Sequence, residues 1–140
     1  MHKKVLVLIL GVCCLLPLQA FAAGGVTYRG LTPGISTLAD TLRVLGRPIS
    51  KVYRDDRIVC KYRTVLVNIP KKTEKVQYII ITDPDFRDVN GIGLGTSYAA
   101  VQKKLKVNGT GNSIVDMEKA IGYVFDKYRR VSQIIYGIIR

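Results

Sequence analysis

A glycine-containing turn followed by a short amphipathic segment occurs twice in this chain, sixty-one residues apart. The first copy, 30–48, has a Thr-Pro-Gly turn, then Ser36 as a helix N-cap, and it ends in Gly-Arg-Pro, which stops a helix. Apolar residues between these limits recur every three or four positions, which predicts one apolar helix face. The second copy, 91–105, has Gly95 and Ser97 at the equivalent positions. The repeat therefore predicts an internal duplication.

Alternating apolar and polar residues follow each predicted helix and indicate strands. The expected strands are 49–54, 57–69 and 76–82 after the first helix, and 113–119, 121–125 and 131–139 after the second. A charged segment, 70–75, reads as a hairpin loop. The sequence thus predicts an α+β fold of two tandem units, each a short helical element packed on an antiparallel β-meander. The units would be about 28–82 and 91–140, joined by an Asp-rich linker at 83–90.

Residues 1–22 have the order of a secretory signal peptide: basic residues, an apolar run of twelve, and small residues up to Ala22. Cleavage there would leave 23–140 as one exported domain, expected in the bacterial periplasm. A rival interpretation is an outer-membrane lipoprotein lipidated at Cys13 or Cys14. Neither cysteine has the small preceding residue that such sites prefer, so the cleaved signal peptide is favoured.

Charge and the missing histidine limit the chemistry of the exported part. The chain has 22 Lys and Arg against 10 Asp and Glu, and loss of two lysines with the signal still leaves a net charge of +10. The single histidine, His2, is lost as well. The remaining chain therefore offers no Ser-His-Asp, Cys-His or His-ligated zinc arrangement. Cys60 is the one cysteine left after cleavage and is expected in the core, with an intermolecular disulfide as the alternative.

Three other patterns could indicate calcium binding, phosphate binding or hydrolysis, and the sequence favours none of these functions. The linker 83–90 is rich in Asp and Asn, which suggests calcium, but it lacks the regular Asp series with a trailing glutamate. The Gly-x-Gly-x-Gly run at 91–95 suggests phosphate binding, but no dinucleotide-type βαβ pattern surrounds it. A carboxylate hydrolase would need two convergent acids. The candidates, which read as solvated turn and surface charges, are Asp40, Asp55, Asp56, Asp116 and Glu118. No cofactor or metal is expected, and we predict that the protein is not an enzyme.

The segments Leu31-Thr-Pro-Gly-Ile-Ser-Thr and Leu45-Gly-Arg-Pro, followed by a β-meander, resemble the SmpA/OmlA (BamE-type) outer-membrane assembly domain. They are also similar to the related β-lactamase-inhibitor-protein-like fold, in which tandem copies build a saddle-shaped sheet. The resemblance covers most of 28–140 and implies a non-catalytic, protein-binding role in the cell envelope. Assembly factors of this type are lipoproteins and usually single units, whereas this chain has two copies and no persuasive lipidation site.

A basic surface is the remaining candidate site. Arg57, Lys61 and Arg63 are expected to share one strand face, with Lys75 on a neighbouring strand and Tyr53 nearby. Because arginine and tyrosine are enriched at protein interfaces, these five residues are predicted to bind an envelope protein. An anionic envelope component, such as lipopolysaccharide, anionic lipid or peptidoglycan, is the alternative partner. Nucleic acid is not expected for an exported protein.

Overall fold

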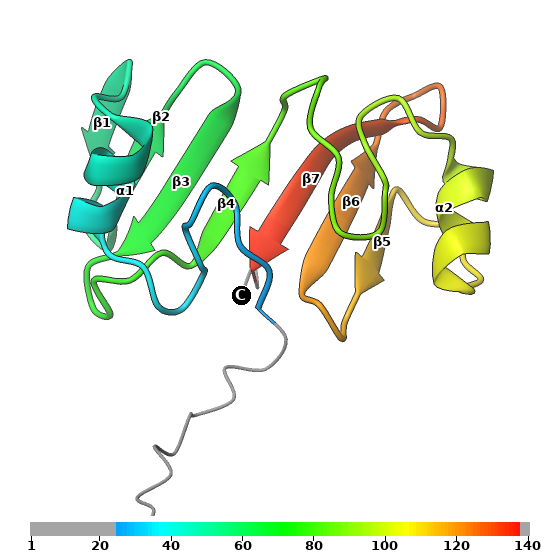
Figure 1. The fold of residues 1–140 in the computed structure, drawn as a ribbon, viewed down its shortest axis with the longest axis horizontal. Helices are drawn as coiled ribbons and strands as arrows, with labels where there is room; N and C mark the ends of the chain where they lie inside the picture. The colour runs from blue at the N-terminus through cyan, green and yellow to red at the C-terminus, as the bar shows by residue number, and fades with distance from the viewer. Residues whose placement is uncertain (1–24, 138–140) are drawn as a thin grey trace, which may run out of the picture.

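Seven strands form one antiparallel sheet in the order β1-β2-β3-β4-β7-β6-β5 (Figure 1). The structure is a computed structural model that describes residues 25–137, so the predicted signal peptide and its two cysteines lie outside the described residues. The strands are β1 (Ser50–Tyr53), β2 (Arg57–Lys61), β3 (Val65–Pro70), β4 (Tyr78–Ile81), β5 (Ser113–Asp116), β6 (Ile121–Phe125) and β7 (Val131–Gly137). Two short helices, α1 (Leu38–Leu45) and α2 (Tyr98–Leu105), complete the described elements.

The expected fold of two tandem helix-on-meander units is wrong. β4 pairs with β7, through Ile79 opposite Tyr136 and Ile80 opposite Ile135, so the strands that follow the two copies belong to one continuous sheet. A free meander would end in a strand with unpaired N–H and C=O groups, and pairing β4 with β7 satisfies both ends at once. The helices have eight residues each, too few to cover a sheet, and lie at opposite ends of it (Figure 1).

The two glycine turns nevertheless join the sheet by the same main-chain contact. Gly34 N–H donates to the carbonyl of Val76 at 2.7 Å, and Gly95 N–H donates to the carbonyl of Val131 at 2.8 Å. The φ angles of Gly34 and Gly95 are +83° and +84°, which favour glycine. The repeated sequence therefore marks two equivalent attachment points on one sheet rather than two separate units.

One of the two predicted helix N-caps is wrong and the other is confirmed. The N-cap of α1 is Thr37, not Ser36: its side chain accepts from the Asp40 amide at 3.2 Å, and the Asp40 carboxylate accepts from the Thr37 amide at 2.9 Å. Ser36 is buried, and its hydroxyl oxygen accepts from the amide of Thr32 at 2.8 Å. For α2, the predicted cap Ser97 is confirmed.

The expected strand 57–69 is in fact two strands, β2 and β3, joined by a turn at 62–64. The turn is closed by the Tyr62 amide, which donates to the carbonyl of Val65 at 2.8 Å. It contains none of the Gly, Pro, Asn or Asp residues that usually signal a turn. The alternation of apolar and polar residues therefore predicted one continuous strand.

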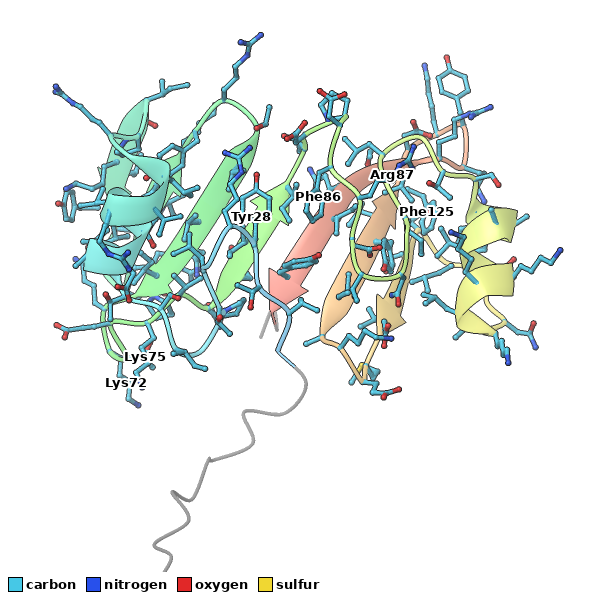
Figure 2. All side chains as sticks on the ribbon, viewed as in Figure 1. Tyr28, Lys72, Lys75, Phe86, Arg87 and Phe125 are labelled. Carbon is cyan, nitrogen blue, oxygen red and sulfur yellow. The ribbon has the colours of Figure 1, made fainter. Side chains whose placement is uncertain are left out.

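Most of the buried side chains of the sheet lie on one of its faces. Residues opposite one another in an antiparallel ladder point to the same face, so Cys60, Val67, Ile79 and Tyr136 form one buried row. The segment 26–36, α1 and the linker lie over this covered face (Figure 1). Phe86 of the linker packs edge-on against both Tyr28 and Tyr136, with its ring centroid 5.3 and 5.9 Å from theirs. Figure 2 shows Phe86 beside Tyr28.

The opposite side of the sheet, here called the open face, buries two residues, Asn68 and Ile135. Six apolar side chains of this face stay at least partly exposed. They are Val52, Val59, Leu66, Ile80, Val124 and Val115. Neither helix found in residues 25–137 has the length and hydrophobicity that a bilayer-spanning helix needs.

Candidate binding surface

Positive charge gathers beside exposed apolar side chains at one end of the sheet, in residues 47–63. This segment, here called the basic hairpin, contains β1 and β2 and has six Lys and Arg against two Asp. β1 is an edge strand, paired only with β2. Ile49 is 74% exposed and Tyr53 is 60% exposed. Large apolar side chains this exposed are unusual beside the unpaired backbone of an edge strand.

Four of the five predicted site residues belong to the basic hairpin. Arg57 lies opposite Pro70, and Lys61 lies opposite Ser50 and Leu66, which places both side chains on the open face. Arg63 follows in the β2–β3 turn and is exposed, so it does not share the strand face as expected. Tyr53 lies opposite Ile58 and therefore points to the other side of the sheet, at its uncovered edge.

Most of these cations have no acidic partner. Arg57 is the exception: its guanidinium lies 2.6 Å from the Asp56 carboxylate, and this hydrogen bond lowers the pKa of Asp56 below its ordinary value. The Lys51 ammonium lies 5.3 Å from the ring centroid of Tyr53. In the part of the chain that the structure describes, no carboxylate lies within ion-pair distance of the other basic side chains of the hairpin, Arg47, Lys51, Arg54, Lys61 and Arg63. The basic hairpin therefore presents uncompensated positive charge.

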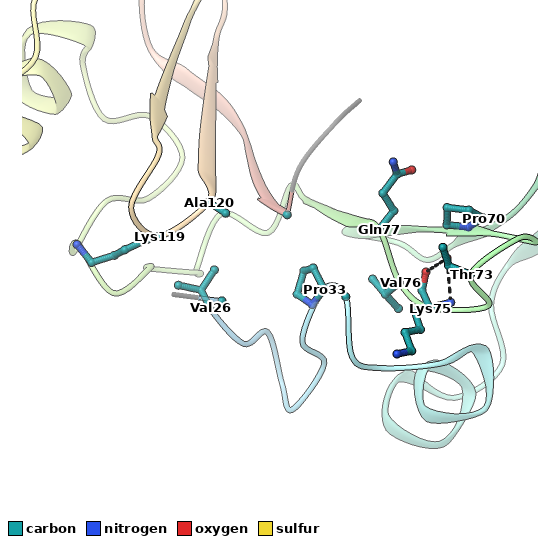
Figure 3. Close-up of a pocket in the computed structure, with 12 residues that line it drawn as sticks. Val26, Pro33, Pro70, Thr73, Lys75, Val76, Gln77, Lys119 and Ala120 are labelled. Atoms are coloured by element: carbon teal, nitrogen blue, oxygen red, sulfur yellow. Dashed lines mark hydrogen bonds between the residues drawn. The ribbon is translucent and has the colours of Figure 1, made fainter. Parts of the chain in front are cut away.

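Lys75 lies apart from the basic hairpin, contrary to the prediction that it occupies a strand beside β2. β3 separates β2 from β4, and Lys75 precedes β4 in a loop, bridged to Thr37. Its side chain instead lines a pocket of about 360 Å³, together with Pro33, Gln77 and Lys119 (Figure 3). The structure thus brings Tyr53, Arg57, Lys61 and Arg63 to one end of the sheet and leaves Lys75 elsewhere.

The Asp-rich linker is held by a buried polar network that the sequence did not reveal. The Asp88 side chain accepts from the amides of Asn90 and Ile92, at 2.9 and 2.8 Å, and from the hydroxyl of Tyr123. The Asn90 side-chain amide donates to Asp116 at 3.0 Å. Partners separated by 26 to 35 positions leave no local pattern in the sequence. Within 25–137, no three His, Cys, Asp or Glu residues are grouped so as to hold a metal ion.

Three of the five carboxylates considered for hydrolysis, Asp40, Asp56 and Asp116, have polar partners. Asp40 caps α1 and lies 3.1 Å from Arg43. Asp116 was expected on the surface, but its side chain is only 10% exposed. Burial alone would raise the pKa of Asp116, yet hydrogen bonds from Asn90 and Lys119 bring it below its usual value.

Cys60 is buried and free, which confirms its predicted place in the core. Burial raises the pKa of its thiol, so both access and thiolate formation are unfavourable.

We expect an aromatic disulfide reagent to leave Cys60 unmodified in the folded, exported protein and to modify it completely in denaturant. Absorbance of the released thiolate measures this. Complete modification of the native protein within minutes would contradict the buried position and reopen an intermolecular disulfide.

Comparisons with known proteins give a fold and no function. No protein-family model and no curated protein matches the sequence. A DUF4309 family protein (YjgB) from Bacillus subtilis is similar in structure, with a TM-score of 0.58 and 15% identity over 83% of this chain and 88% of that one. An extracellular protein containing a SCP domain from Bacillus anthracis has a TM-score of 0.54 and 13% identity over 72% of this chain. This chain matches only 42% of that longer protein.

These neighbours correct the resemblance inferred from the sequence. The fold is similar to the DUF4309 protein and to part of the SCP-domain protein, and the BamE-type and β-lactamase-inhibitor-like assignment is wrong. The Pro-Gly turn and the Leu-Gly-Arg-Pro stop carried that assignment, and both are general signals of helix boundaries that recur in unrelated folds. At identities of 13% and 15%, the similarity establishes a shared sheet architecture.

Proposed function

We propose that this protein is a non-catalytic binding module that acts outside the cytoplasm and captures a protein partner through the basic hairpin. The observation that carries the proposal is the combination of uncompensated cations with exposed Ile49, Val52 and Tyr53 on one edge of the sheet. The signal-like residues 1–22 support export, and one structural neighbour is described as extracellular. The periplasm is the compartment we propose for it.

The exposed apolar side chains favour a protein over a purely ionic partner. Buried apolar area contributes roughly 25 cal/mol per Å², and salt does not screen this contribution. Tyrosine and arginine at the centre of an interface commonly contribute most of the binding energy. A protein partner should therefore remain bound at salt concentrations that weaken simple charge attraction.

Anionic lipid or glycan remains the second candidate, because each Lys or Arg near an anionic membrane contributes about 1 kcal/mol. Such binding would depend on the same cations. It should fall steeply with salt, since exposed charges are screened over about 10 Å at 0.1 M ionic strength.

The test reverses charge at the open end of the basic hairpin. We expect Lys61→Glu with Arg63→Glu to reduce capture of the partner roughly tenfold or more, while the melting temperature changes by only a few degrees, because both side chains are exposed. The measurement is in-cell crosslinking of the tagged protein and mass spectrometry, with washes at low and high salt. Lys72→Glu with Lys103→Glu is the matched control, since both lysines are exposed and lie outside the hairpin.

Discrete protein partners that persist at high salt and are lost only in the hairpin variant would support the proposal. Equal loss in both variants would show a general charge effect and would remove the hairpin as the binding site. Recovery of lipid or glycan alone, and only at low salt, would favour the second candidate.

A further inference from the structure

The two edge strands of the sheet, β5 and β1, differ in how far other elements cover them. β5 has α2 beside it, and Leu105 and Val107 at the end of this helix are partly buried against the core. β1 has no such cover: Ser50 is half-buried, and the other three residues of the strand are exposed. Edge strands are usually protected because their unpaired backbone can recruit another strand. The unprotected edge of β1 therefore needs an explanation.

The backbone of β1 offers free hydrogen-bonding groups to a partner. Arg54 N–H donates across the hairpin to the carbonyl of Arg57 at 2.8 Å. Main-chain groups in an antiparallel strand alternate in direction, so those of Lys51 and Tyr53 point away from β2. No other described strand pairs with β1, and these groups remain available.

We propose that the partner adds an extended segment to the free edge of β1 as an eighth strand, and that this segment alternates acidic and apolar residues. This rests on the proposed function and specifies how its partner binds. Strand addition provides affinity through main-chain hydrogen bonds and specificity through alternate side chains.

The side chains around the edge define the chemistry of that segment. Arg47, Lys51 and Arg54 surround β1 without a carboxylate partner among the described residues, which favours acidic positions. On the open face, Val52 lies opposite Val59, so an apolar residue on the added strand would extend this row. A groove of about 540 Å³ between the end of α1 and residues 47–51 lies beside the edge. A second copy fits less well, because two β1 edges would bring like charges together.

The test uses a fluorescent, capped peptide of three Glu-Val repeats and its Lys-Val counterpart, with the full exported chain. We expect saturable binding of the Glu-Val peptide and no binding of the Lys-Val peptide. At saturation, the amides of Lys51 and Tyr53 should exchange with deuterium roughly tenfold more slowly, since a new hydrogen bond protects each of them. Binding without protection at these two amides would overturn the proposal, as would self-association of the chain in place of peptide binding.

A pair of variants separates the backbone from the side chain. Tyr53→Pro removes an N–H that points away from β2, and proline is tolerated in an edge strand. The affinity of this variant for the Glu-Val peptide should be roughly tenfold lower than that of Tyr53→Val, which keeps the donor. Equal affinities of the two folded variants would overturn strand addition. Should Tyr53→Pro fail to fold, the exchange measurement on the unaltered chain still decides. If partner capture depends on Lys61 and Arg63 while the edge amides stay unprotected, the proposed function stands and strand addition fails.

Discussion

Replacing Gly137 by alanine should lower the free energy of unfolding by about 3 kcal/mol or more, because the new methyl group has no space and the backbone is unfavourable for it. Gly137 has φ of +105° and pairs with Tyr78 where β7 meets β4. An added Cβ would overlap the carbonyl oxygen of Gln77 and lie 3.0 Å from the side chain of Pro33. These neighbours are backbone or proline atoms, which cannot move aside cheaply.

Urea denaturation followed by circular dichroism measures this loss. Gly111→Ala is the matched control, since a Cβ there would meet nothing nearer than 3.9 Å, and we expect a change below about 1 kcal/mol. Equal stability of the Gly137 variant and the control would show that the junction between β4 and β7 is looser than the structure has it.

Replacing Asp88 by alanine should also cost about 3 kcal/mol, because it leaves several donors without their acceptor. Asp88 is 8% exposed and accepts from the amides of Asn90 and Ile92 and from the Tyr123 hydroxyl. Each buried donor left unpaired costs roughly 1–3 kcal/mol. The variant should therefore loosen the linker from the second half of the sheet.

The same denaturation experiment tests this, with Asp85→Ala as the control. Asp85 is exposed in the same linker, and its replacement should change stability by no more than about 0.5 kcal/mol. Tyr123→Phe should fall between the two, since it removes one donor and keeps the ring. A loss for Asp88→Ala no larger than for Asp85→Ala would contradict the structural role of the network.

Local features were accessible from the sequence because short-range physics sets them. The helices ending at Leu45 and Leu105, the cap at Ser97 and the burial of Cys60 all follow from capping residues and from apolar periodicity. The concentration of Arg57, Lys61 and Arg63 in one short segment is likewise evident from the sequence. Errors arose where local signals compete or are missing, as at Ser36, where the next residue forms the cap, and at the unsignalled turn 62–64.

The pairing of β4 with β7, which makes the sheet continuous, depends on contacts between residues distant in sequence. No sequence pattern near β4 or β7 predicts that they pair. The unpaired N–H and C=O groups of a strand edge can form hydrogen bonds with any other edge of suitable register. The Asp88 network and the separation of Lys75 from Lys61 likewise depend on which strands become neighbours. The helices, most strands and the basic segment depend on neighbours along the chain, and they could therefore be predicted from the sequence. The single continuous sheet and the exposed edge at β1 emerge only from the folded chain, because strand order depends on pairing between residues that are distant in sequence.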